Sequence, residues 1–584
     1  MLRTLLTSLL VPLFSQCLIS GIGNIIPLKK STYIYNVLTV LLLYTLLNTI
    51  LWQYQINFLI VITFFYFLSI AMYYVHEFRG TNANYSDLSS LNTAKEVASG
   101  YTYKIKLSFV IIFIIILAEF ILHISYYKIN FFENYHKVID NIESVNIDIY
   151  RYVWHECGQI LLFFFILFLM KDIVSSKQFD YSLLAGEKEG YLYNFLSSIP
   201  FFHKKAIDKE NDESASIKAS SNSKLSFNII DTENAQIFDS INNGGRKYPH
   251  IIVIMNESFG SVHRRIKTNR PVTEYFDNLK GVVKGDVYVN TFGGGTANTE
   301  FEFLTGVSIG NYPYPVMPYN NFVKREKYSL AKYFRNLDYE TIAMHPYTAT
   351  NYNRDKVYKR FGFDKLLFYE DFRDRKYIRD FVSDESMYEE VIRRYKEVKE
   401  DKKQAFIFGV TMQNHSGYND FDSEEIVSDI DVVDGKNTID SYLSLVKKSD
   451  DAIKVLIDFF SKEKEEVILL FFGDHNASFS TSLNKQIYGM SFDYECSNAY
   501  VTPFFIYNNK KSIDRNVEAV SANFLSIELL NEAGLPFDML HKYLDSIYKD
   551  YDVFNYHKMR NRHDKKKSDI KIDELNKYER EYLK

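Results

Sequence analysis

Short apolar runs that end in metal-binding side chains constrain the fold of this 584-residue chain more than any other feature. Residues 250–255 lead into Glu257, and residues 467–472 lead into Asp474 and His475. Continuous apolar runs of this length are typical of strands that are buried on both faces of a parallel sheet. Ligands in such sheets gather beyond the carboxyl ends of the strands. The three side chains are therefore expected to converge.

Residues 247–547 alternate short apolar runs with helical patterns, which predicts an α/β domain with a mainly parallel sheet. Strands are predicted at 250–255, 286–289, 341–344, 405–410, 467–472 and 503–507. Helices are predicted at 296–304, 330–336, 386–397, 438–461 and 522–532.

The first 175 residues hold nearly all of the long apolar stretches, and the pattern predicts an N-terminal α-helical transmembrane bundle of about five helices. Each stretch approaches the ~20 residues needed to cross a bilayer. The predicted spans are 5–26, 33–51, 56–75, 107–126 and 153–170. Residues 176–246 are expected to be a juxtamembrane segment and polar linker, and residues 548–584 a charged tail. The distribution of Lys and Arg among the loops does not fix the orientation.

Charge and cysteine content narrow the function further. The net charge of −5 excludes an obvious nucleic-acid footprint. Cys496 is the only cysteine of the predicted α/β domain, so that domain has no internal disulfide.

Residues 293–300, GGGTANTE, bring Thr296 to the start of a predicted helix. Free backbone N–H groups and the positive end of the helix dipole favour an anionic phosphate there. A metal ion bound to the hydroxyl would make an alkoxide nucleophile accessible. From this local sequence alone, a simple helix N-cap is the more common reading. The competing hydroxyls of Thr299 and Thr305 fall inside or beyond the helix.

Two carboxylates, an imidazole and a threonine oxygen suit a divalent ion such as Mn²⁺, Mg²⁺ or Zn²⁺. Three further residues are candidates for substrate contacts, although each has a simpler reading. His415 follows the predicted strand 405–410, but a lone histidine is more often structural. Arg354 suits bidentate recognition of a phosphate, but it could equally form a surface ion pair. His345 ends the predicted strand 341–344.

Five motifs in order carry a family resemblance: NESF at 256–259, GGGTANTEFE at 293–302, NRD at 353–355, NHSG at 414–417 and GDH at 473–475. With them the chain resembles the lipoteichoic acid synthases and related phosphoglycerol transferases of the sulfatase and alkaline phosphatase superfamily. Five matches in the family's order are a far stronger signal than any single one.

The resemblance implies an extracellular, sulfatase-like catalytic domain on a cell membrane protein whose N-terminus is cytoplasmic. The metal ligands that it implies are Glu257, Thr296, Asp474 and His475. It makes Thr296 the nucleophile and His415 the group that binds the phosphate or protonates the leaving oxygen. The expected substrate-binding residues are Arg354, His415, Tyr352 and His345.

The activity implied is transfer of glycerophosphate from phosphatidylglycerol, or a similar phospholipid, through a phosphothreonine intermediate. The cofactor implied is a divalent ion, Mn²⁺ first, with Mg²⁺ or Zn²⁺ as alternatives. Two positions depart from the lipoteichoic acid synthase pattern: Tyr352 replaces a tryptophan, and Tyr347 replaces an acidic residue. The acceptor therefore stays open between a polyglycerolphosphate polymer and a glycan of the cell envelope.

Three alternatives are weaker. Phosphoethanolamine transferases share the threonine, the metal and the spans, but they usually have disulfides in the soluble domain, which Cys496 alone cannot form. A sulfatase needs a Cys or Ser at the position of Thr296 to make formylglycine. A binding protein on a decayed enzyme fold would not be expected to keep the complete ligand set.

Overall fold

The computed structural model describes residues 54–79, 105–107, 109–118, 120–121 and, with five short gaps, 247–561, together with a few isolated residues. The gaps are residues 312–316, 419–424, 431–435, 490–496 and 556–557. The chain divides into two compact units, which are described separately. Unit 1 comprises Met1–Leu88 and Tyr103–Ala219, and unit 2 comprises Ser89–Thr102 and Ser220–Lys584.

Unit 2 is built on an eight-stranded sheet in the order β10-β2-β9-β8-β1-β7-β3-β4. Its strands are β1 (His250–Asn256), β2 (Val282–Tyr288), β3 (Tyr339–Met344), β4 (Lys365–Leu367), β7 (Gln404–Val410), β8 (Val467–Gly473), β9 (Val501–Asn508) and β10 (Arg515–Ser521). Neighbouring strands run parallel except that β9 is antiparallel to both β2 and β8. The predicted mainly parallel sheet is therefore confirmed.

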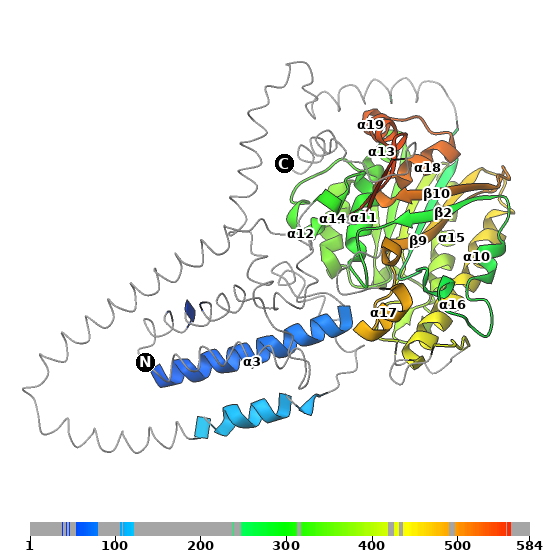
Figure 1. Cartoon of the computed structure of the whole chain (residues 1–584). Coiled ribbons are helices and arrows are strands. Elements are labelled where there is room, and N and C mark those ends of the chain that lie inside the picture. The colour runs from blue at the N-terminus through cyan, green and yellow to red at the C-terminus, as the bar shows by residue number, and fades with distance from the viewer. Residues whose placement is uncertain are drawn as a thin grey trace, which may run out of the picture. The chain divides into compact units, whose positions relative to one another are not determined.

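Helices cover both faces of this sheet (Figure 1). They are α10 (Glu274–Asn278), α11 (Thr296–Thr305), α12 (Pro318–Asn321), α13 (Leu330–Asn336), α14 (Arg354–Phe361), α15 (Asp384–Glu400), α16 (Lys436–Phe460), α17 (Thr481–Tyr488), α18 (Leu525–Ala533) and α19 (Met539–Tyr548). Short 3-10 helices lie at Val262–Arg264, Ile309–Asn311, Asn351–Asn353, Tyr369–Asp371, Ser497–Tyr500 and Ala522–Phe524.

The central strand β1 shows why this architecture forms. Its seven residues are all buried, so both of its faces need a partner layer. Ile251 and Val253 belong to one apolar core with residues of α11, α13 and α18, whereas Ile252 and Ile254 belong to a second core with residues of α15 and α16. Successive side chains of a strand point to opposite faces, so the continuous apolar run dictates a three-layer α/β/α sandwich.

The strand and helix predictions hold best in the centre of the domain. The predicted strands at 250–255, 405–410 and 467–472 are each confirmed to within one residue. The predicted strand at 286–289 is wrong in its start, because β2 begins at Val282 and runs through Lys284 and Gly285. The predicted helix at 522–532 is a 3-10 turn followed by α18.

The start of the predicted charged tail is also corrected. Residues after 550 form an antiparallel hairpin of β11 (Tyr551–Asn555) and β12 (Lys558–Asn561). Val553 and Phe554 are buried, and the Phe554 amide donates to Ser521 Oγ at 2.5 Å. This apolar pair anchors the segment to the domain. The many charged residues around the pair had led to the prediction of a tail here.

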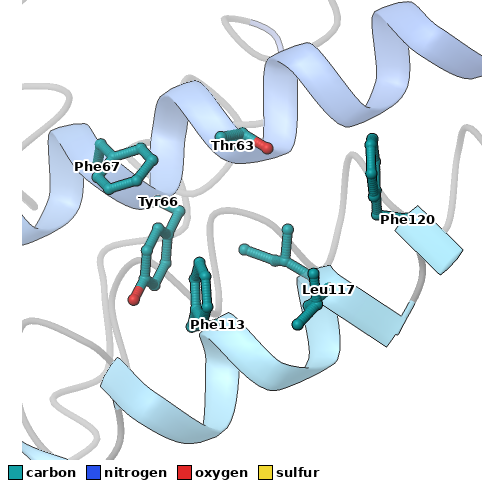
Figure 2. Close-up of a pocket in the computed structure, with 7 residues that line it drawn as sticks. Thr63, Tyr66, Phe67, Phe113, Leu117 and Phe120 are labelled. Atoms are coloured by element: carbon teal, nitrogen blue, oxygen red, sulfur yellow. The ribbon is translucent and has the colours of Figure 1, made fainter.

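In unit 1, the helix α3 (Tyr54–Arg79) packs against helical residues 107, 109–118 and 120–121. Tyr66 donates a hydrogen bond to the carbonyl of Phe109 at 3.0 Å. An apolar pocket lies between the two helices, and Figure 2 shows side chains from both that line it, among them Thr63, Phe67, Phe113 and Phe120.

The transmembrane bundle is not shown. Among the residues that the structure describes, no helix meets the combined length and hydropathy that a membrane crossing requires. The predicted span 56–75 falls within α3, and the described part of span 107–126 is helical. The predicted spans 5–26, 33–51 and 153–170, and most of the predicted linker, lie outside the described residues or almost entirely so.

Candidate active site

The register between two neighbouring strands brings the predicted metal ligands together. The strands β1 and β8 are parallel, and Asn256 of β1 pairs with Gly473 of β8. The next residue of each strand, Glu257 and Asp474, must therefore emerge side by side. The Ser258 amide donates to Asp474 Oδ1 at 2.7 Å and joins the two strand ends directly.

Thr296 reaches the same place from the glycine run. Gly293, Gly294 and Gly295 have φ values of 68°, 148° and 85°, a region that residues with a Cβ rarely adopt. Gly295 is the N-cap of α11, so Thr296 is the first helical residue. Its Oγ1 donates to Glu257 Oε2 at 3.2 Å, and its side chain is almost fully buried.

Glu257, Asp474 and His475 form a buried cluster whose potential ligand atoms lie within 4.8 Å of one another. His475 Nε2 lies 3.2 Å from Asp474 Oδ2 and 3.6 Å from Glu257 Oε1. His475 Nδ1 lies 3.1 Å from the carbonyl oxygen of Asn476, so it carries the proton and donates. The lone pair of Nε2 therefore faces the carboxylates, the orientation that a metal-binding histidine requires.

Two atoms of this cluster lack a hydrogen-bond partner although they are buried: Asp474 Oδ2 and His475 Nε2. Buried polar atoms are nearly always paired, so orphan atoms call for a ligand. Burial raises the pKa of the Glu257 carboxyl, and the charge of Asp474 raises it further. Burial also raises the pKa of Asp474. A divalent cation would remove the cost of burying two adjacent carboxylates, so the residues fit a metal ion.

His415 emerges from β7 at the same edge of the sheet, because β7 runs parallel to β1. Its Nδ1 has no hydrogen-bond partner. Burial lowers the pKa of the imidazole, while the charge of Glu257 acts in the opposite direction. The predicted role of His415 in the chemistry stays a prediction.

Arg354 lies in a buried ion pair. Its side chain is 1% exposed, and its Nε and Nη2 donate to Glu300 Oε1 at 3.1 and 2.5 Å. Glu300 also accepts from the hydroxyls of Tyr319 at 2.9 Å and Tyr358 at 2.5 Å. Arg354 does form an ion pair, but the pair is buried, so the alternative that placed it on the surface is wrong. The predicted contact of Arg354 with a phosphate stays a prediction.

His345 and Tyr352 both lie against this guanidinium. His345 Nδ1 lies 3.0 Å from the Val410 carbonyl oxygen and donates to it, so Nε2 accepts from Arg354 Nη1 at 3.1 Å. The Tyr352 ring centroid lies 5.1 Å from the Arg354 guanidinium carbon, within cation–π range. In this structure the two residues support Arg354, and their predicted contacts with substrate are not tested.

Several supporting residues were missed by the sequence reasoning. The Glu257 amide donates to Thr411 Oγ1 at 3.0 Å. Asn256, one residue before Glu257, donates to Asp384 Oδ2 at 2.7 Å. Burial raises the pKa of Asp384 to about 6. Asp384, in the acidic first turn of α15, and Asn256, at the polar end of an apolar run, can both be picked out in the sequence. Their contact cannot be predicted from it.

The domain has a mainly parallel sheet, and at the carboxyl edge of this sheet the Thr296 hydroxyl lies beside a buried cluster of potential metal ligands. These features define a sulfatase-like α/β domain with a candidate metal centre. The family model described as Sulfatase matches residues 249–546, about half of the chain, and the chain belongs to this family. A curated relative described below confirms the resemblance to the lipoteichoic acid synthases.

Two curated relatives illustrate the family. The chain is 32% identical over 320 residues to a Rhizobium meliloti protein named "Putative cyclic beta-1,2-glucan modification protein", a match that covers 53% of this chain and 50% of the relative. It is 22% identical over 338 residues to the lipoteichoic acid synthase-like protein YvgJ of Bacillus subtilis, covering 56% of this chain and 51% of the relative. The chain thus matches about half the length of these relatives.

Among solved structures, the Streptococcus pyogenes phosphoglycerol transferase GacH in complex with sn-glycerol-1-phosphate is similar in fold. The TM-score is 0.50 at 20% identity, and the match covers 62% of this chain and 92% of that structure. At this level of identity the likeness supports the fold of the domain.

Proposed function

We propose that this protein is a metal-dependent phosphotransferase that moves glycerophosphate from phosphatidylglycerol to a hydroxyl of a cell-envelope glycan or polymer through phosphothreonine 296. The observation that carries the proposal is the Thr296 hydroxyl, which hydrogen-bonds Glu257 beside two orphan ligand atoms at the start of α11. A hydroxyl in that position meets a phosphate at the positive end of a helix dipole.

The chemistry is a double displacement. Thr296 Oγ1 attacks the phosphorus of the lipid, and the bond to the diacylglycerol oxygen breaks. An acceptor hydroxyl then attacks the same phosphorus and restores the threonine. A divalent ion held by Glu257, Thr296, Asp474 and His475 would stabilise the threonine alkoxide and the charge on the phosphate.

His415 is suited to carry the proton between the two half-reactions. It gives a proton to the leaving oxygen and takes one back from the acceptor, so its protonation state is restored after each turnover. Its Nδ1 has no hydrogen bond to break before it acts. Glu257, which accepts the Thr296 hydrogen bond, is placed to receive the threonine proton in the first half-reaction and to return it when the threonine oxygen leaves the phosphorus in the second.

The comparisons support the choice of donor and acceptor. A phosphoglycerol transferase with bound sn-glycerol-1-phosphate has the same fold, which favours a glycerophosphate group. A relative named for glucan modification favours a glycan acceptor. A lipid donor also favours a multi-pass protein of the cell membrane whose catalytic domain is extracellular. Protease accessibility of tagged termini in intact cells tests that location.

The decisive experiment uses purified full-length protein, Mn²⁺ and phosphatidylglycerol labelled in its headgroup. We expect a labelled peptide that contains Thr296 and complete loss of label in Thr296→Ala. Thr296→Ser is the matched control, because it keeps the hydroxyl and should keep part of the activity. Full turnover by Thr296→Ala would overturn the proposal. Because Thr296 is the first helical residue and does not cap α11, the alanine variant should fold.

The same experiment distinguishes phosphatidylglycerol from a second candidate donor, phosphatidylethanolamine. With labelled phosphatidylethanolamine in place of phosphatidylglycerol, labelling of Thr296 would identify a phosphoethanolamine transferase. We expect labelling from phosphatidylglycerol only.

A further inference from the structure

A small hairpin lies against the loop that carries His415. Its strands are β5 (Tyr377–Ile378) and β6 (Phe381–Val382), and Arg379 occupies the turn with φ at +54°. A non-glycine residue in this region costs on the order of 1 kcal/mol, so other contacts must hold it there.

The side chain of Arg379 supplies those contacts. Its guanidinium donates to the carbonyl oxygens of Gln413 at 2.8 Å, His415 at 2.7 Å and Gly417 at 3.0 Å. Hydrogen bonds from a charged donor are stronger than neutral ones. The hairpin and the His415 loop are therefore fastened to each other, and whatever binds the hairpin is held at a fixed place relative to the imidazole.

Four aromatic side chains gather on and beside this hairpin: Tyr347, Tyr369, Tyr377 and Phe381, here named the aromatic platform. The Phe381 ring centroid lies 5.6 Å from that of His415 and 6.3 Å from that of Tyr347. The hydroxyls of Tyr369 and Tyr377 lie 2.8 Å apart, and the Tyr369 amide donates to the Tyr347 carbonyl at 3.0 Å.

The aromatic platform is not part of the apolar interior. None of its four residues belongs to the two core clusters of the described part of unit 2. Tyr377 is 46% exposed, and the other three are partly exposed. Large aromatic side chains that remain accessible beside a reactive group point to a ligand surface rather than to packing.

The chemistry of the aromatic platform favours a neutral sugar ring over the other acceptors. The guanidinium groups of Arg375 and Arg379 lie over the rings of Tyr369 and Phe381 at 4.2 and 5.1 Å, so the exposed ring of Tyr377 offers the main stacking face. An aromatic face carries a negative potential and attracts the C–H face of a pyranose, and the phenolic hydroxyls can hydrogen-bond to its rim. A polyanionic acceptor would favour a positive surface. Residues 369–381 instead carry four basic residues (Arg373, Arg375, Lys376 and Arg379) and four acidic residues (Glu370, Asp371, Asp374 and Asp380), a net charge of zero.

We propose that the aromatic platform of Tyr347, Tyr369, Tyr377 and Phe381 binds a neutral sugar ring of the acceptor and thereby presents a sugar hydroxyl to His415. This inference rests on the proposed function and names the acceptor class for the same site.

Tyr377→Ala in the full-length protein is the first test, because Tyr377 is the most exposed of the four residues. With a neutral β-glucan oligosaccharide as acceptor, we expect KM for the oligosaccharide to rise about tenfold, the loss of roughly one stacking contact. Labelling of Thr296 from the lipid should not change. Tyr377→Phe is the matched comparison: it keeps the ring and loses only the hydroxyl, so KM should rise less than in Tyr377→Ala.

Binding without turnover gives a second readout. Saturation-transfer NMR of the Thr296→Ala protein should show contact with the neutral oligosaccharide, weakened by adding Tyr377→Ala or Phe381→Ala, and no preference for polyglycerolphosphate. Unchanged binding and unchanged acceptor KM in both platform variants, or preferential binding of polyglycerolphosphate, would overturn the inference. Intact Thr296 labelling in that case would leave the proposed function standing. Absent labelling with intact oligosaccharide binding would refute the function and keep the sugar site.

Discussion

Two clusters of buried charged groups are tied to helix α11, and they differ in how many of their polar atoms find partners inside the protein. Glu300, on one side, is saturated by Arg354, Tyr319 and Tyr358. On the other side, Asp474 Oδ2 and His475 Nε2 have no hydrogen-bond partner. A buried charge whose partners are all internal serves the fold, whereas one with orphan atoms is prepared for a ligand. Thr296 and Glu300, four residues apart, connect the two.

The largest expected effect comes from the orphan cluster. Asp474→Asn keeps the oxygen that accepts from the amides of Ser258 and His475, so the fold should persist. We expect transfer activity to fall on the order of a thousandfold, because the proposed metal centre would lose one of its ligands. Calorimetric titration with Mn²⁺ should show the loss of binding.

Stability without metal is the control for that variant. In the presence of a chelator, the free energy of unfolding of Asp474→Asn should equal or exceed that of the wild type, since one of two repelling carboxylates is gone. A large loss of stability in chelator would mean that the cluster is structural and would remove the contrast with Glu300.

The saturated cluster should behave in the opposite way. Arg354→Met leaves the Glu300 carboxylate buried without its cation, and we expect a loss of about 3–5 kcal/mol in the free energy of unfolding. Urea unfolding of the full-length protein measures it. The double variant Arg354→Met/Glu300→Gln should recover much of this loss. If Arg354→Met were as stable as the wild type and only weakened substrate binding, Arg354 would belong to the substrate site.

Glu302 is an intermediate case and gives the smallest effect. Its Oε1 accepts from Asn290 at 2.6 Å and from the Ile309 amide at 2.9 Å, whereas Oε2 has no partner. Burial raises the pKa of this carboxyl to about 7. The Glu302 carboxyl ionises more readily in the unfolded chain than in the folded one. Its stabilising contribution to the free energy of unfolding, at most about 3 kcal/mol, is therefore complete below pH ~4.5 and is lost as the pH rises through ~7.

Glu302→Gln should abolish this part of the pH dependence. Urea unfolding at pH 5 and pH 8 should show a smaller difference in stability for Glu302→Gln than for the wild type. The exposed Glu370→Gln serves as the control and should keep the wild-type difference. Equal pH dependence in all three proteins would contradict the assignment to Glu302.

The sequence predicted the centre of the domain well because burial on both faces leaves a continuous apolar run, as in β1, β7 and β8. Strands at and near the edge of the sheet carry no such signal. β2, the second strand from one edge, contains Lys284 and Gly285, and the edge strand β10 has exposed residues in its first half. The antiparallel direction of β9 cannot be read from its composition, since the same residues suit either direction.

The candidate site divides in the same way. The convergence of Glu257 and Asp474 follows from two strand ends in parallel register, which local patterns can predict. The contact of Arg354 with Glu300 joins residues 54 positions apart, and it depends on a burial of arginine that composition argues against. Arg379 donates to backbone carbonyls, which every residue has, so the sequence at those positions does not indicate the contact.

The pairing of Asn256 with Gly473 has a consequence for folding. A slip by one residue would exchange the faces of β8, yet both faces are apolar, so hydrophobicity alone would tolerate the error. Gly473 forbids it sterically, because a Cβ there would lie 2.0 Å from the Phe259 carbonyl oxygen. The Ser258 amide, which needs Asp474 as its acceptor, enforces the same alignment. Gly473 and Asp474, at the edge of the candidate site, thus also fix the register in which the two central strands pair during folding.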